Sequence, residues 1–271
     1  MLRLFTQEKI PVKLPSGTRV TAIGDIHGQL TRLTRLMEKV DKLRQEQPVK
    51  SDYVIFMGDF VDRGPKSAEI IDYLVQRRKK AKKQGKHKEI FLQGNHEELL
   101  LDSLNENDKR QDLWWRNGGQ QTVNSYLKFQ NIELTDDVDM LHRITLLRQH
   151  FPEKHLKFLS KLKDLYQVGP LVFVHAGLRM EHPLNKQVSS DLRWIRDPFL
   201  NWKGQKKDFM VVHGHSITKG FKPEILKHRI GIDTGSYKTK GRITAAIFQK
   251  NTVKFLASGT KKDFKQNKFS D

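Results

Sequence analysis

The chain has 271 residues, a formal net charge of +19, 37% hydrophobic residues and no cysteine. The length allows one large domain or two ordinary ones, and the composition is typical of a globular protein rather than a disordered or fibrous one. The lack of cysteine excludes disulfides, thiolate zinc sites and enzymes with a cysteine nucleophile, so a metal would have to be held by His, Asp, Glu or Asn. The positive charge favours anionic partners, among them phosphorylated substrates, nucleotides, nucleic acid and acidic proteins.

No targeting or membrane segment is predicted. No run approaches the roughly 18 apolar residues of a membrane span. The first residues also lack the apolar core of about 7 to 15 residues that a secretory signal requires. We therefore expect no membrane partner and a cytoplasmic location, while the oligomeric state is left open.

The N-terminal part alternates strands and helices. Apolar runs predict strands over 19–23, 53–57 and 89–92, and each is followed by a polar turn and a helical pattern. The first helix is expected over about 29–45, and Pro65 is predicted at the first position of the second helix. Three such units in succession indicate right-handed parallel βαβ construction.

A basic run, Arg77-Arg-Lys-Lys-Ala-Lys-Lys, ends the second predicted helix before Gly85. It could form a nucleic-acid patch or a nuclear-import signal. Cations at a helix C-terminus also stabilise the helix dipole and are readily solvated. We favour this second, structural interpretation of the run.

The remaining chain divides into a helical and a β-rich part. Residues 105–165 show no clear strand and include predicted helices over 141–150 and 153–162, so we expect a helical, cap-like insertion over the strand ends. Strands are predicted over 171–174 and 209–212, and a closing hairpin over 242–249 and 252–256. We expect a single domain over 1–260 and a charged C-terminal tail over 261–271.

Polar residues follow five separate apolar runs. Asp25 and His27 lie two apart where the first strand ends, so they are expected on one face, where they could grip a divalent ion. Taken singly, these residues have structural explanations: Asp25 could cap a helix, and Asn95 with Glu98 resembles a capping box. His175 could be an ordinary histidine at a strand end. The joint pattern is harder to explain in this way, because all five turns would meet at one edge of the sheet.

The stretch Gly58-Asp-Phe-Val-Asp-Arg-Gly64 places two carboxylates and a guanidinium in one tight turn. Our hypothesis is that Asp59 bridges two metal ions about 3.5 to 4 Å apart, Asp62 orients a histidine and Arg63 holds a phosphate. The mixed oxygen and nitrogen donors suit Mn best, with Fe or Zn as alternatives. The candidate metal ligands are Asp25, His27, Asp59, Asn95, His175 and His215.

These turns resemble the ordered motifs of the bacterial phosphoprotein phosphatases, which are metal-dependent serine/threonine phosphatases within the calcineurin-like metallophosphoesterases. The motifs are Gly24-Asp-Ile-His-Gly28, Gly58 to Gly64, Gly94-Asn-His-Glu97, His175-Ala-Gly177 and Gly214-His215. Details typical of the bacterial branch are Trp115-Arg-Asn-Gly-Gly119, Leu192-Arg-Trp-Ile-Arg-Asp-Pro-Phe199 and Gly231-Ile-Asp-Thr-Gly235. The resemblance implies an α/β fold with a central β-sandwich of two mixed sheets flanked by helices, in α/β/β/α order, with a helical insertion.

The resemblance also implies a role for each matching residue. One ion would be held by Asp25, His27 and Asp59, and the other by Asp59, Asn95, His175 and His215. His96 would be the general acid, paired with Asp62, while Arg63, Arg196 and Asn95 would bind the substrate phosphate and Arg116 is a weaker candidate. His213 competes with His215 for the last ligand position, and we favour His215 because it follows Gly and precedes Ser216.

The implied activity is hydrolysis of phosphomonoesters, with phosphoserine and phosphothreonine in proteins as the main substrates. A hydroxide bridging two metal ions would attack phosphorus in line, and His96 would protonate the leaving group. The alternative is a dinucleoside-tetraphosphate hydrolase or RNA-cap pyrophosphohydrolase with the same centre. That branch usually departs from Asp at position 62 and from Glu at position 97, so Asp62 and Glu97 favour the phosphatase. A basic nucleic-acid-binding protein is a third hypothesis, but it would predict lost ligands, and every expected position is filled.

Overall fold

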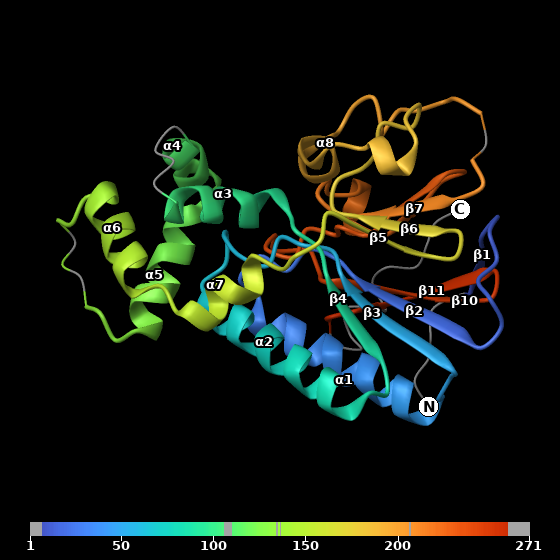
Figure 1. Ribbon diagram of the computed structural model, residues 1–271, viewed down its shortest axis with the longest axis horizontal. Helices are drawn as coiled ribbons and strands as arrows, with labels where there is room; N and C mark the ends of the chain where they lie inside the picture. The colour runs from blue at the N-terminus through green and yellow to red at the C-terminus, as the bar shows by residue number, and fades with distance from the viewer. Residues whose placement is uncertain (1–6, 106–109, 134, 136, 206, 260–271) are drawn as a thin grey trace.

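The computed structural model describes residues 7–105, 110–133, 135, 137–205 and 207–259 (Figure 1). Two mixed β-sheets pack face to face, with helices on the outside, which confirms the predicted α/β fold. The six-stranded sheet has the order β1 (Glu8–Lys9), β11 (Thr252–Ala257), β10 (Thr244–Gln249), β2 (Thr18–Ile23), β3 (Ser51–Phe56) and β4 (Lys88–Phe91). The five-stranded sheet has the order β5 (Leu165–Val168), β6 (Leu171–Val174), β7 (Met210–His213), β9 (Arg229–Gly231) and β8 (Glu224–Ile225).

Parallel pairing aligns the strand ends that carry the polar turns. In the six-stranded sheet β2, β3 and β4 are parallel, which confirms the predicted βαβ units. Their register pairs Ile23 with Phe56 and Phe56 with Phe91, so the three turns that follow leave the sheet at one level. In the other sheet β6 and β7 are parallel and pair Val174 with His213. Five turns therefore emerge along the same end of the sandwich.

Two long helices cover the outer face of the six-stranded sheet, and these are α1 (Leu30–Glu46) and α2 (Ser67–Gln84). The first buries Leu33, Leu36, Met37 and Val40 at the spacing that the sequence predicts. The second does not begin at Pro65. Lys66 is its N-cap, and the turn after Asp62 reaches further than expected because the Asp62 backbone N–H bonds to Ser67 at the first helical position.

The predicted insertion contains helices α4 (Gln111–Trp114), α5 (Gln120–Phe129), α6 (Met140–His150) and α7 (Glu153–Leu159). It follows α3 (Asn95–Leu104) and includes a π-helical turn, η2 (Trp115–Gly119). Its apolar side chains share one buried cluster with α1, α2 and the outer face of the six-stranded sheet. In Figure 1, α4, α5 and α6 extend beyond one end of α2. The insertion is thus joined to the rest through a continuous core.

A second apolar layer lies between the two sheets, and a third lies on the outer face of the five-stranded sheet, where α8 (Ser189–Trp194) packs. The strands β1, β5, β8 and β9 and the helix α8 were not predicted. The strands β1, β8 and β9 have only two or three residues, too few for a periodic pattern to emerge. The four-residue strand β5 is a partly exposed edge and lacks the uniform burial of β6 and β7. The predicted tail over 261–271 lies outside the described residues, and no helix in the described part is long and apolar enough to cross a membrane.

Candidate metal centre and phosphate-binding site

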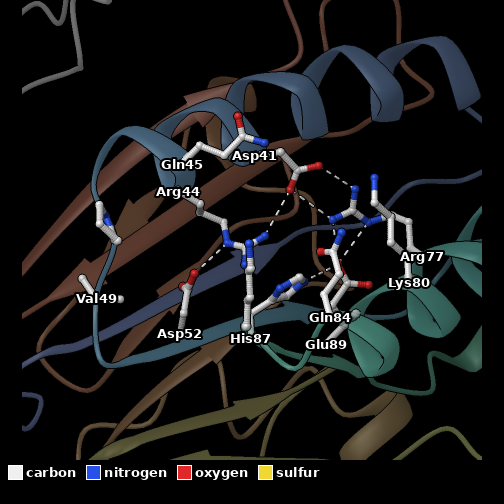
Figure 2. A pocket seen from close by; sticks show the side chains of 13 residues that line it. Asp41, Arg44, Gln45, Val49, Asp52, Arg77, Lys80, Gln84, His87 and Glu89 are labelled. Atoms are coloured by element: carbon white, nitrogen blue, oxygen red, sulfur yellow. Dashed lines mark hydrogen bonds and ion pairs between the residues drawn. The ribbon is translucent and has the colours of Figure 1, made fainter.

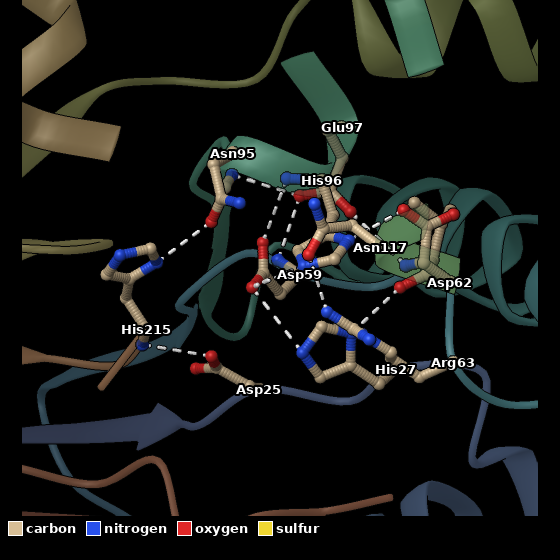
Figure 3. Close-up of polar contacts among 12 residues, drawn as sticks. Asp25, His27, Asp59, Asp62, Arg63, Asn95, His96, Glu97, Asn117 and His215 are labelled. Carbon is tan, nitrogen blue, oxygen red and sulfur yellow. Dashed lines mark hydrogen bonds and ion pairs between the residues drawn. The ribbon is translucent and has the colours of Figure 1, made fainter. Parts of the chain in front are cut away.

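The predicted ligand side chains meet where the strands end (Figure 3). Asp59 lies at the centre, with its side chain only 3% exposed. His27 Nε2 is 3.5 Å from one of its carboxylate oxygens, and His175 Nε2 is 3.3 Å from the other. His96 Nε2 is 3.9 Å from the oxygen that faces His27. One carboxylate therefore joins histidines from two sheets, which is the arrangement a bridging ligand requires.

A second group of ligand candidates surrounds the amide of Asn95. Its Oδ1 lies 3.1 Å from His175 Nε2 and 2.8 Å from His215 Nδ1. The backbone N–H of His215 donates to Asp25 Oδ2 at 2.9 Å. The other Asp25 oxygen is buried and has no hydrogen-bond partner among the described residues. A buried carboxylate oxygen without a donor fits a cation, because it is costly to bury otherwise.

Backbone carbonyls orient two of the imidazoles. His27 Nδ1 lies 3.0 Å from the carbonyl of Val61, and His175 Nδ1 lies 2.8 Å from the carbonyl of Met57. A carbonyl accepts only, so each Nδ1 carries the proton and donates it. Nε2 of each ring therefore faces Asp59, and in the neutral ring it carries the lone pair that can bind a metal. This is the orientation that metal-ligating histidines generally have.

Burial and neighbouring charges set the pKa values in the cluster. Burial and the nearby His96 lower the pKa of His27 to about 3, and burial with His175 lowers that of His215 to about 3. Both rings are therefore neutral, which is the form that binds metal. Burial opposes the charge of His175, but the carboxylate of Asp59 raises its pKa to about 10. Burial likewise opposes the charge of Asp59, yet His175 and His96 hold its pKa well below the usual range.

Five residues of the site have a left-handed backbone conformation. His27, Asp59, Asp62, Arg63 and His215 have φ values between 46 and 68°. Only eight described residues other than glycine have positive φ, so most of these conformations are at this site. Each costs of the order of 1 to 3 kcal/mol, and such strain persists only where surrounding contacts impose it.

Glycines leave room for the carboxylates of this site. A Cβ at Gly94 would collide with Asp59 Oδ1, and one at Gly214 would collide with Asp25 Oδ1. These collisions explain why both turns carry glycine directly before Asn95 and His215.

Glu97 fixes the Asp59 turn in place. Its fully buried carboxylate accepts backbone N–H bonds from Asp59, Phe60, Val61 and Gly94 at 2.7 to 3.2 Å. Burial and the nearby Asp59 raise the pKa of Glu97 to about 7. Gly94 is therefore the N-cap of α3, and Glu97 at its third helical position accepts the Gly94 N–H, so the predicted pair of Asn95 and Glu98 was one residue out of register.

His96 and Asp62 form the predicted pair, with His96 Nδ1 2.6 Å from Asp62 Oδ2. Asp62 also accepts hydrogen bonds from Trp114 Nε1 and from Thr122 Oγ1, both in the insertion. Burial opposes the charged form of His96, but Asp59 and the bond to Asp62 raise its pKa. A positively charged imidazole with Nε2 facing the open site is suited to donate a proton.

The arginines Arg63 and Arg196 line the same cavity, which has a volume of about 440 Å³. Arg63 donates to Asn117 Oδ1 at 2.7 Å, and its backbone N–H bonds to the carbonyl of Gly118 in η2. Arg196 donates to Ser216 Oγ at 3.0 Å. Arg116, by contrast, bonds to the backbone of its own helix and does not line the cavity.

Several lining residues were not identified from the sequence as parts of the site. They are Asn117, Trp194, Ile217, Asp233 and Tyr237. Asp233 belongs to the motif Gly231 to Gly235, which was noted only for its family resemblance. Burial and the nearby Asp59 raise its pKa to about 6. The centre of the Tyr237 ring lies 5.0 Å from the centre of the His27 ring and 5.5 Å from Cζ of Arg63.

His213 lies apart from this cluster. Its Nε2 is 3.1 Å from Arg229 Nη1, its ring packs on Phe199, and it is 1% exposed. Burial and the Arg229 guanidinium lower its pKa to about 3. Of the two candidate histidines, the structure thus brings His215 to the other ligand candidates and places His213 in the core.

A sandwich of two mixed sheets with Asp, Asn and His converging at the strand ends is the arrangement of a metallophosphoesterase. The chain belongs to the calcineurin-like phosphoesterase family, whose pattern it matches over residues 18–259. It is therefore a hydrolase of phosphoesters, and its fold implies divalent metal ions. Within the described part of the chain, two groups of side chains could hold such ions, namely His27, Asp59 and His96, and Asp59, His175 and His215.

The relatives differ in the substrates that their names indicate. The chain is 24% identical to the asymmetrical bis(5'-nucleosyl)-tetraphosphatase PrpE of Oceanobacillus iheyensis, across 93% of this chain and 97% of that protein. It is 39% identical to serine/threonine-protein phosphatase 5 of Arabidopsis thaliana, but across only 23% of this chain and 11% of that protein. A crystal structure assigned as a diadenosine tetraphosphatase has a TM-score of 0.57 and 19% identity, covering 92% of this chain and 97% of that one.

Proposed function

We propose that this protein hydrolyses dinucleoside polyphosphates at a centre of two divalent metal ions. The observation that carries the proposal is the nearly full-length likeness to tetraphosphatases, compared with a likeness of 62 residues to a protein phosphatase. This reverses the preference drawn from Asp62 and Glu97. The cavity supports the choice, because Arg63 and Arg196 lie in it beside the aromatic side chains of Trp194 and Tyr237. Guanidinium groups suit phosphates, and aromatic rings suit stacked bases.

The ligand sets are those expected from the sequence. Asp25, His27 and Asp59 would hold one ion, and Asp59, Asn95, His175 and His215 would hold the other. Mn is the ion that this mixed set favours, with Fe or Zn as alternatives. Two bound cations would lower the pKa of a water towards neutrality and neutralise phosphate oxygens.

The residues of the chain perform the remaining work. Arg63, held by Asn117, and Arg196, held by Ser216, would bind the non-bridging phosphate oxygens and orient the phosphorus. As water adds to phosphorus and the bond to the leaving oxygen breaks, His96 would give its Nε2 proton to that oxygen. Asp62 holds the other ring nitrogen and stabilises the charged imidazole.

A second candidate function is hydrolysis of phosphoserine and phosphothreonine in proteins. The buried pair of His96 and Asp62 favours it, because proton donation matters most when the leaving group is a strongly basic alkoxide. When a dinucleoside polyphosphate is cleaved, the leaving nucleotide is a weaker base, so proton donation by His96 matters less. The pair would thus be better suited to a phosphomonoester than to an anhydride.

Parallel turnover experiments on the purified, metal-analysed protein test the two functions. We expect kcat/KM for diadenosine tetraphosphate to exceed that for every member of a phosphoserine and phosphothreonine peptide panel. A clear preference for any phosphopeptide would reverse the assignment. In both cases His96→Asn should retain the metal and slow hydrolysis by about 10² to 10⁴ for alkyl phosphates, and less for nitrophenyl phosphate. Equal losses for the two esters would contradict the role of His96 as acid.

A further inference from the structure

Two hollows flank the C-terminal end of α2, and neither is lined by a candidate metal ligand. They share the rim residues Ala81, His87 and Glu89, and their volumes are about 420 and 510 Å³. Both are lined by parts of the basic run that the catalytic site does not use. The two hollows differ in how far their cations are already neutralised.

In the smaller hollow the arginines are paired with carboxylates (Figure 2). Arg77 donates to Asp41 at 2.7 Å and to Glu89 at 2.6 Å. Arg44 donates to Asp52 at 2.8 Å and to Asp41 at 3.1 Å. These pairs tie α1, α2, β3 and β4 together and neutralise both arginines. This hollow is therefore a structural network.

The larger hollow carries cations without such partners. Arg78, Lys82, Lys88, Lys161 and Lys163 line it, and the lysines are exposed. No carboxylate of the described residues forms an ion pair with any of the five. The single acidic residue of its lining is Glu89, whose side chain is 1% exposed and already bound to Arg77. We call these five cations and the hollow between them the basic hollow.

Aromatic rings lie beside the lysines of the basic hollow. Tyr166 lines it, partly exposed, and its ring centre lies 6.4 Å from that of Tyr53. Lys88 Nζ lies 5.8 Å from the centre of the Tyr53 ring. Cations beside a partly exposed aromatic ring suit a polynucleotide, since phosphates pair with the cations and a base can stack on the ring.

Other polyanionic surfaces fit the basic hollow less well. An anionic membrane favours a convex surface with protruding apolar side chains, whereas this surface is concave. The exposed large apolar residues of the described chain are Leu113, Leu141, Leu156, Val188, Ile217 and Leu226, and none of them lines it. A duplex keeps its bases stacked inside, out of reach of Tyr166. A single strand can place a base in the hollow.

We propose that the basic hollow binds single-stranded nucleic acid, with Lys82, Lys88, Lys161 and Lys163 on the phosphates and Tyr166 against a base. This site does not depend on which phosphoester the metal centre hydrolyses. Lys163 connects the basic hollow to the metal centre. Its backbone carbonyl accepts a hydrogen bond from the Gln93 N–H, and Gln93 is two residues before Asn95. A bound strand would therefore lie beside the β4 edge that leads to the metal centre.

Fluorescence anisotropy of the metal-loaded protein with a 3'-fluorescein uridylate 12-mer tests the proposal. The oligomer has a 5'-hydroxyl, so the catalytic arginines find no terminal phosphate on it. The triple variant Lys88→Glu, Lys161→Glu, Lys163→Glu should bind at least tenfold more weakly. Because each phosphate contact contributes about 0.7 to the slope of log affinity against log salt for a single strand, the slope should fall by about 2.

A matched variant has the same change in charge at exposed lysines on other surfaces, Lys128→Glu, Lys203→Glu, Lys227→Glu. It should bind the oligomer within a factor of about three of wild type, and both triples should keep nitrophenyl phosphate turnover. Tyr166→Leu should weaken binding of the oligomer but leave binding of polyglutamate unchanged. Equal weakening by both triples, or polyglutamate binding as tight as the oligomer, would overturn the assignment.

Discussion

Glu97→Gln should destabilise the protein far more than its isosteric change suggests. In the amide one oxygen becomes an NH₂ group, so two of the four backbone N–H groups that Glu97 accepts would face a donor. A buried donor left without an acceptor costs about 1 to 3 kcal/mol, which gives about 2 to 6 kcal/mol for two. This is a large part of the roughly 5 to 15 kcal/mol by which a domain is stable.

The assay is urea unfolding followed by circular dichroism at about pH 8.5, where Glu97, with its pKa of about 7, is ionised. The neighbouring Glu98→Gln is the control, because Glu98 accepts only side-chain bonds from the partly exposed Arg110, Arg193 and Trp194. It should cost about 1 kcal/mol or less. A free energy of unfolding for Glu97→Gln within about 0.5 kcal/mol of wild type would refute this explanation of the Asp59 turn.

Three further outcomes are expected. His215→Asn should lower the bound metal, measured by mass spectrometry, by at least about tenfold. His213→Asn should keep the metal and reduce thermal stability. Equal metal loss in the two variants would contradict the placement of the two rings. Asn117→Ala should lower kcat/KM about tenfold without loss of metal. Arg116→Ala, on the same helical turn, should leave kcat/KM unchanged. Similar losses in the two variants would contradict the role of the Asn117 amide in orienting Arg63. Arg77 and Arg44 hold the pKa of Asp41 below its usual value despite burial. This carboxylate therefore stabilises the fold above about pH 4 and loses its contribution as pH falls through its lower folded pKa. Urea midpoints of Asp41→Asn and wild type should differ most at neutral pH and converge in acid.

The parts of the site predictable from sequence are those set by local order along the chain. Strands such as β2 and β3 end in apolar residues followed by a polar turn, so their ends, and hence Asp25 and Asp59, could be located from the sequence. Parallel pairing then brings these turns together, because the last residues of the two strands, Ile23 and Phe56, are paired. His175 and His215 follow from the same rule in the other sheet.

The remainder depends on long-range packing that leaves little trace in the local pattern. Asn117 reaches Arg63 only because η2 inserts a wide helical turn at Gly118, where φ is 101°. Asp233 follows β9, a strand of three residues, too short to predict. The substrate preference based on Asp62 and Glu97 is not supported by the nearly full-length relatives, which are named as tetraphosphatases. Glu97 holds the Asp59 turn in place, which hydrolysis of either substrate class requires, so this residue does not separate the two classes. The pair of Asp62 and His96 remains the feature that favours a phosphomonoester.

The division of the ligand candidates between the two sheets links catalysis to thermal stability. Asp25, Asp59 and Asn95 follow strands of the six-stranded sheet, whereas His175 and His215 follow strands of the other. Ions bound between them would clamp the sandwich at one end. At a free metal concentration of about 100 times Kd, such a clamp adds about 2.7 kcal/mol, or roughly 5 to 10 °C in Tm for a chain of this size. In cells starved of metal, the protein would then lose both thermal stability and activity.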